Sequence, residues 1–289
     1  MFVKLAELVM SGRLQALLVT AALGMLGQNI PSILGPMLTW GAIVLVALVV
    51  LRKGFSEAIW PFTGALVPVG MAWVAGDMSV MGALVGGFAG ALVLANTRQL
   101  DFALLMVAFV AVLLKGAIGF FPEQTALLYE QFNLMLEQLK KDGFEQFEIE
   151  SQQFLIYSIV WTSAWMGTTA LLCARWLQAK LYNPGGFQKE FHQLRVSQPV
   201  LGVLMVGIVI GQVFPLMEGV LPVLLMPILL AGFALIHGVA KIKGLGKRPI
   251  VLMYGSIALF GPFALLMVTV AAITDSFSNY RDKMLPPES

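Results

Sequence analysis

The chain has 289 residues, of which 58% are hydrophobic and only 12% are charged, so it is far more apolar than a soluble domain. A water-soluble globule is excluded, and a net charge of +2 gives no concentrated basic face for nucleic acid. Because a membrane helix needs ~20 largely apolar residues, we expect an all-α, polytopic transmembrane helical bundle in the lipid bilayer.

Uncharged apolar stretches along the chain predict about nine spans. They cover residues 14–27, 33–51, 58–76, 80–95, 102–121, 154–177, 200–216, 220–239 and 250–274. The first and seventh are short for a full crossing, so a count of about eight is the alternative. The first stretch has no small-x-small cleavage pattern after it, and we expect it to be retained rather than removed as a signal peptide.

The longest polar stretch, 122–153, divides one membrane domain into a five-span half at 1–121 and a four-span half at 154–289. Within this polar stretch, apolar residues recur at helical spacing, at Leu128, Phe132, Met135 and Leu139. The pattern predicts an amphipathic helical segment on the extracytoplasmic side. Two roles remain open: the helix rests on the membrane surface or the bundle, or it is a lid over an outward-facing pocket.

The basic residues indicate the orientation of the spans, because Lys and Arg prefer the cytoplasmic side of short loops. Nine spans place one group on the side of the N-terminus: Lys4, Arg13, Arg52, Lys53, Arg98, Arg175, Lys180, Lys189, Arg195, Lys241, Lys243, Lys247 and Arg248. The opposite side receives Lys140, Lys141, Arg281 and Lys283. We therefore expect a multi-pass protein of a bacterial cytoplasmic (inner) membrane, with a cytoplasmic N-terminus and an extracytoplasmic C-terminus.

Glycines four residues apart predict close helix packing in two spans, at Gly82, Gly86 and Gly90 and again at Gly207 and Gly211. Such faces serve packing within one chain, or they dock a separate membrane protein. The spacing does not distinguish a possible membrane protein partner from internal packing.

The residues that carry chemistry in enzymes are sparse in this chain. The histidines, His192 and His237, have no neighbouring ligand at metal-binding spacing, and Cys173 is the single cysteine. Hydrolase and zinc-protease motifs and paired intramembrane carboxylates do not occur in the sequence. We expect neither an enzyme nor a metal site, and no cofactor.

Lys115 is the clear case of an ionisable residue inside a predicted span, six residues before Phe121, which places it ~9 Å below the outer end. Such residues mark functional sites by default, although a lysine at this depth can also reach the surface with its long side chain. The nine-span arrangement puts other polar or aromatic residues at the same outer level. Together they predict an outward-facing, substrate-binding pocket built from Lys115, Asp77, Glu218, Trp161, Gln212, Gln28 and Asn29.

Two loops carry a family resemblance. The segment 174–187 (ARWLQAKLYNPGGF), followed by 190–195 (EFHQLR), resembles the YybS-like family of uncharacterised bacterial multi-pass membrane proteins, and 243–247 (KGLGK) fits it. That family is similar in fold to the substrate-binding components of energy-coupling-factor transporters, which implies a ligand cavity open to the outside. Those components carry alanines four apart on an early helix, where this chain has the looser series Ala16, Thr20 and Gly24.

Two functions from different classes follow. One is a solute-binding, transport-related component that takes a small anionic or zwitterionic molecule from the outside. The other is a non-transporting membrane scaffold or assembly partner of other membrane proteins. The first requires a polar outer cavity, and the second requires an apolar groove on the outside of the bundle.

Overall fold

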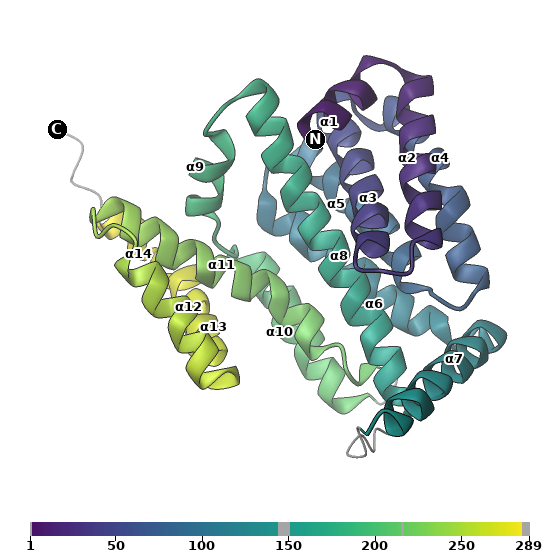
Figure 1. The fold of residues 1–289 in the computed structure, drawn as a ribbon. Coiled ribbons are helices and arrows are strands. Elements are labelled where there is room, and N and C mark those ends of the chain that lie inside the picture. Colours follow the sequence, from purple (N-terminus) through teal and green to yellow (C-terminus); the bar gives the residue numbers. More distant parts are fainter. Residues whose placement is uncertain (1, 144–150, 215–216, 285–289) are drawn as a thin grey trace.

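The computed structural model of the chain describes residues 2–143, 151–214 and 217–284. Its elements are α-helices, arranged as a bundle in which the long α8 runs obliquely between the N-terminal and C-terminal helices (Figure 1). The helices are α1 (Phe2–Ser11), α2 (Arg13–Asn29), α3 (Leu34–Lys53), α4 (Phe55–Val74), α5 (Ser79–Thr97), α6 (Leu100–Ile118), α7 (Pro122–Lys141), α8 (Ser151–Tyr182), α9 (Gly186–Gln193), α10 (Gln198–Val213), α11 (Leu221–Ile242), α12 (Arg248–Phe260), α13 (Pro262–Ser278) and α14 (Tyr280–Met284).

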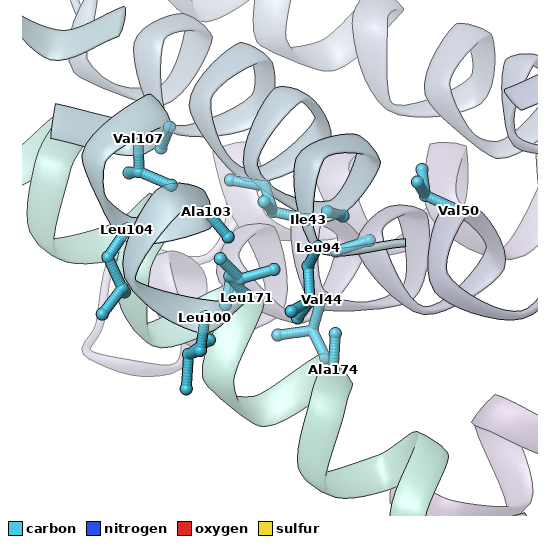
Figure 2. Close-up of a cluster of buried hydrophobic side chains, with 14 of the residues drawn as sticks. Ile43, Val44, Val50, Leu94, Leu100, Ala103, Leu104, Val107, Leu171 and Ala174 are labelled. Carbon is cyan, nitrogen blue, oxygen red and sulfur yellow. The ribbon is translucent and has the colours of Figure 1, made fainter. Parts of the chain in front are cut away.

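The centre of the N-terminal part is α3, which packs against α2, α4, α5 and α8. Every residue from Ile43 to Val50 is at most 2% exposed. A helix that is apolar on all sides must be surrounded by other apolar helices. Figure 2 shows this core, in which Ile43 and Val44 of α3 belong to one apolar cluster with Leu94 of α5, Leu104 of α6 and Leu171 of α8.

The glycine series of α5 lies where that helix crosses α6 and α8. A Cβ built on Gly82 would come within 2.2 Å of Ser163 Oγ, and one on Gly90 within 2.7 Å of Val107. At Gly86 the nearest atom is 3.5 Å away, which is an ordinary contact. Gly82 and Gly90 are thus the positions that require glycine, while Gly86 is buried without being tightly confined.

The second glycine pair packs α10 onto α11. Built Cβ atoms would lie 3.1 Å from Leu224 at Gly207 and 3.0 Å from Val220 at Gly211. These separations are longer than the 2.2 Å at Gly82, so this crossing is less constrained.

Small residues also join α2 to α4. Thr20 Oγ1 donates to the Pro61 carbonyl at 2.8 Å, and a Cβ on Gly64 would meet the Leu17 carbonyl oxygen at 2.3 Å. Gly24 faces Pro68 in the same way, at 2.4 Å. The series Ala16, Thr20 and Gly24 is therefore buried inside this chain and is not an open docking surface.

Five helices are long and apolar enough to cross a membrane, namely α3, α5, α6, α8 and α11, or six spans if α9 and α10, bent by 62°, form one. The chain is accordingly an integral membrane protein built as a helical bundle. The predicted count of about nine spans is not confirmed, although each of the first eight apolar stretches corresponds to one helix.

The last apolar stretch, predicted as one span, is two helices. α12 ends at Phe260 and α13 begins at Pro262, with Gly261 between them at φ +48°. Their 13 and 17 residues extend ~20 and ~26 Å, less than the ~30 Å of hydrocarbon. α13 returns alongside α11 and α12, so the pair is a helical hairpin.

This hairpin corrects the predicted position of the C-terminal region. Buried Arg281 of α14 donates to the carbonyls of His192 and Leu194 at 2.7 and 3.0 Å and pairs with Asp275 at 2.6 Å. α14 therefore lies at the same end of the bundle as α9, whereas a single final span would have carried it to the opposite end. Arg281 and Lys283 thus join the larger basic group.

Candidate functional site

At the end of the bundle opposite α9, a cavity of about 600 Å³ lies between α6, α7, α8 and the turn before α11. This volume is within the range of small-molecule pockets. Its wall combines charged, hydroxyl, amide and apolar groups: Lys115, Ile118, Gly119, Pro122, Thr125, Ala126, Tyr129, Gln153, Ile156, Tyr157 and Glu218.

The predicted amphipathic helix forms one wall of this cavity. Pro122 lies in the first turn of α7, where its missing N–H is tolerated, and the helix ends before Gly143, at φ +93°. Gly76, at φ +100°, lets the backbone of α7 approach, because a Cβ there would be 3.1 Å from Leu128 N. Gln131 Nε2 also donates to the Ala75 carbonyl at 3.3 Å. α7 thus rests on the bundle and borders the cavity at the same time; residues 144–150 of the predicted segment lie outside the described residues.

Lys115 provides the positive charge of the cavity. It lies in the last turn of α6, three residues before the helix end, hence ~4.5 Å from it along the axis. This is shallower than the depth predicted from Phe121, because α6 ends earlier than the apolar stretch. Its Nζ lies 5.0 Å from the centre of the Tyr157 ring, a cation–π distance.

Glu218 provides the negative charge, from a different part of the chain. Its carboxylate interacts electrostatically with Lys115 and with Tyr157. The neighbouring Gly219 has φ +81°, and a Cβ there would come within 2.2 Å of the Tyr157 ring. Glycine is therefore required for this turn to bring Glu218 beside Tyr157. Lys115 and Glu218, both described, do not form a direct ion pair, so opposite charges line one cavity without neutralising each other in contact.

The other predicted pocket residues do not line this cavity. Asp77 Oδ1 accepts hydrogen bonds from Ser79 N and Oγ at 3.0 and 2.5 Å, so it stabilises the start of α5. Trp161 stacks on Trp165 with ring centres 6.0 Å apart, and both rings are substantially exposed. The remaining three are exposed at helix ends: Gln28, Asn29 and Gln212.

The cavity also contains residues that the sequence analysis did not single out, above all Tyr157, Tyr129, Thr125 and Gln153. Thr125 and Tyr129 are four residues apart on α7 and thus share a face. That spacing is visible in the sequence. What the face turns towards depends on how α7 folds back, which the spacing does not indicate.

Comparison of the chain with protein-family models, curated proteins and solved structures gave no match. Within the described ranges, no group of three or more His, Cys, Asp or Glu residues could hold a metal ion. The site is thus defined by its own geometry: a cavity at one end of a helical membrane protein, with an ammonium, a carboxylate and aromatic rings on its walls.

Proposed function

We propose that this protein is a solute-binding, transport-related membrane component whose ligand is a small zwitterion such as a free amino acid. The observation that carries the proposal is the placement of Lys115 and Glu218 on one cavity of about 600 Å³. A zwitterion offers a carboxylate to the first and an ammonium to the second, which satisfies charges that are costly to desolvate alone. Tyr157 adds an aromatic face for the ligand's ammonium or apolar part.

The proposed orientation places this cavity on the extracytoplasmic side of a bacterial cytoplasmic membrane. Lys and Arg favour the cytoplasmic side, and the end that carries α9 and α14 holds the larger basic group. With α14 at the α9 end, Lys140 and Lys141, in the last turn of α7, are the basic residues left at the opposite end of the bundle in addition to Lys115. The basic residues are therefore distributed more unequally between the two ends than the sequence predicted.

We also propose membership of the YybS-like family. The two neighbouring segments that carry the resemblance are joined by an ion pair, between Arg175 and Glu190 at 2.7 Å. Gly185 of the first segment is the N-cap of α9 with φ +85°, in the left-handed region that glycine tolerates best. The small residues of α2 pack against α4. They are therefore not the docking surface for an energising partner.

The test is ligand-dependent thermal stability of the purified full chain in detergent, measured against a panel of the common amino acids. A ligand that binds the native state raises its stability in proportion to ln(1 + [L]/Kd). We expect at least one amino acid to raise the melting temperature of the wild type. Lys115→Met and Glu218→Gln should abolish that rise while their melting temperatures without ligand stay close to the wild type.

Lys115→Arg distinguishes a pocket residue from a surface anchor. Arginine also reaches the membrane surface but differs from lysine in shape and donor geometry, so ligand stabilisation should fall in the pocket case and persist in the anchor case. Lys141→Met, at the end of α7 and away from the cavity, is the matched control. Full ligand stabilisation of Lys115→Met, or no amino acid that stabilises the wild type, would refute the zwitterion site.

A second candidate is a membrane scaffold or assembly partner, favoured by an apolar groove of about 590 Å³ between α11, α12 and α13. Its lining includes Leu252, Phe260 and Phe263, which are 72%, 63% and 66% exposed. A photo-crosslinking amino acid at Leu252 separates the two functions in native membranes. Crosslinks to one protein would support the scaffold function. Crosslinks to lipid alone would contradict it and leave solute binding as the proposed function.

A further inference from the structure

A second polar cavity, of about 340 Å³, lies at the opposite end of the molecule, where α9, α11 and the start of α12 meet. It is independent of the Lys115 cavity and of the function proposed for it. Its lining is rich in nitrogen donors: Gln188, His192, His237, Lys241 and the backbone at Gly244 and Gly246.

The charge around this cavity is of one sign. Lys241 lines it, and Lys243, Lys247 and Arg248 follow within the same short connection, immediately after the candidate span α11. All four are exposed, and no ion pair or side-chain hydrogen bond involves them in the part of the chain that the structure describes. Clusters of four or more basic residues just cytoplasmic of a membrane helix attract anionic lipid headgroups.

The acidic side chains of the neighbouring helices do not line the cavity. Glu190 of α9 pairs with Arg175, and Asp275 of α13 is buried in its pair with Arg281. Asp282 of α14 accepts a hydrogen bond from the Asn279 side chain. A positive field without a facing carboxylate is the condition for binding an anion.

The two imidazoles add donors at a fixed position. The rings of His192 and His237 are 6.3 Å apart between centres, and Tyr254 OH lies 3.4 Å from His237 Nε2. Burial, and then the charges of His237 and Lys241, lower the pKa of His192. The positive charges that disfavour protonation of His192 favour an anion beside it, and a bound anion would act to raise its pKa.

The glycine connection leaves the cavity open on one side. Gly244 and Gly246 have φ +63° and +64°, in the left-handed region that glycine tolerates best. No atom lies within 4 Å of a Cβ built on either residue. The backbone is therefore accessible, and a group as large as a phosphate can approach it.

From this geometry we propose that the cavity binds an anionic phosphate group, held by Lys241, His192 and His237 and attracted by Lys243, Lys247 and Arg248. Two sources offer this chemistry at a membrane surface, an anionic phospholipid headgroup and a soluble phosphate compound. The shared requirement is a phosphate with net negative charge, because a zwitterionic headgroup brings its own cation.

The experiment is native mass spectrometry of the purified full chain in detergent, titrated with dioleoylphosphatidylglycerol, with dioleoylphosphatidylcholine and with inorganic phosphate. We expect the anionic lipid to bind about ten-fold more tightly than the zwitterionic lipid. A double variant, Lys241→Gln with Lys247→Gln, should weaken binding of the anionic lipid about thirty-fold, from the typical contribution of each basic residue near a membrane surface. Lys140→Gln with Lys141→Gln removes the same charge at the other end and should leave it unchanged.

The arms of the titration identify the source. If inorganic phosphate binds the wild type and displaces the anionic lipid, the natural ligand is a soluble phosphate. If it does not, and the anionic lipid binds more tightly than the zwitterionic lipid, the ligand is the lipid headgroup. Equal binding of the two lipids without binding of inorganic phosphate, or an equal loss in both double variants, would overturn the proposal.

Discussion

The N-terminal and C-terminal parts of this membrane protein are packed in different ways. α3 is buried on all sides, and α5 presses its glycines against α6 and α8. In α10, by contrast, Val203, Val206 and Val209 are 57–62% exposed, and Met253 is the buried residue of α12. The first part is built around a fully buried helix, whereas α10 and α12 of the second part expose apolar faces that suit contact with lipid.

The two parts are held together by different interactions. The N-terminal helices approach at backbone distance, so dispersion over many contacts stabilises them. The C-terminal hairpin meets α11 at one such point, where a Cβ on Gly232 would lie 2.6 Å from the Val268 carbonyl oxygen, and it is also fixed by a polar clamp, Arg281 on the carbonyls of His192 and Leu194. We therefore expect the largest effect of removing a charge in the C-terminal part, and effects of side-chain volume in the N-terminal part.

The largest effect is expected at the clamp. Arg281→Gln leaves Asp275, whose side chain is 2% exposed, as a buried charge without its cation, and removal of one partner of a buried pair costs ~3–5 kcal/mol. We expect a fall of that size in the free energy of unfolding in detergent. Limited proteolysis should also cut at α12–α14 before it cuts the N-terminal helices.

The control for this prediction is Lys283→Gln in the same short helix, because Lys283 is exposed. It removes the same charge from the same end of the bundle. Equal stability of the two variants would show that the clamp contributes nothing, and early cleavage of α2–α6 in Arg281→Gln would contradict the division into two parts.

The next effect tests packing in the N-terminal part. Gly64→Ala puts a methyl group 2.3 Å from the Leu17 carbonyl oxygen, so α2 and α4 must separate, and such overpacking costs ~1–3 kcal/mol. Gly70 is on the same helix, yet nothing lies within 4 Å of its built Cβ. Gly70→Ala should therefore be neutral or stabilise by ~0.4–1 kcal/mol, because alanine restricts the unfolded chain.

Thermal unfolding of the two alanine variants under identical conditions measures this difference. The opposite signs make the comparison independent of any general effect of adding a methyl group to α4. Destabilisation of both variants to the same degree would remove the claim that α2 and α4 touch at backbone distance.

Hydropathy and helix spacing predicted much of this fold, because they report which faces avoid water. Eight of the apolar stretches and the amphipathic helix of the polar segment, α7, are present as helices. The break at Gly261 was missed, since the stretch 250–274 is continuously apolar and a single Gly-Pro step does not change its mean hydropathy. The position of α14 depended on that break, so the predicted side of the C-terminal region failed with it.

The candidate cavity was predictable only in part, for a similar reason. Lys115 stood out because a charge at membrane depth is costly, and the structure places it on one cavity with Glu218. Glu218 was predicted because the arrangement of spans puts it at the same outer level. Asp77 stood out for the same reason but has a local role beside Ser79. Tyr157 was not predicted, because a tyrosine within an apolar helix is not by itself a sign of a site. Only the turn at Gly219 makes it a neighbour of Glu218.

The smallest expected effect concerns an exposed polar tie in the N-terminal part. Arg13 Nη2 and Glu57 Oε1 are 2.6 Å apart at the start of α2 and α4, but the Arg13 side chain is 60% exposed, so solvent and salt screen the pair. The hydrogen bond from Arg13 is the main cause that lowers the pKa of Glu57. Burial opposes it, and the charges of Arg13 and Lys53 assist it.

A carboxyl whose pKa is lower in the folded state stabilises the protein at pH values above its unfolded pKa, and this contribution is lost as the pH falls through the folded value. The wild type should thus melt slightly above Glu57→Gln from pH 7 down to about pH 5, and the difference should shrink below the ordinary glutamate pKa of 4.5. Since every other acid titrates in both proteins, the difference between their melting curves isolates this pair. High salt should reduce it at every pH, as expected for an exposed ion pair. A difference that persists at pH 3, or one that salt leaves intact, would mean that Glu57 acts through packing and that the two parts of the molecule differ less than their contacts indicate.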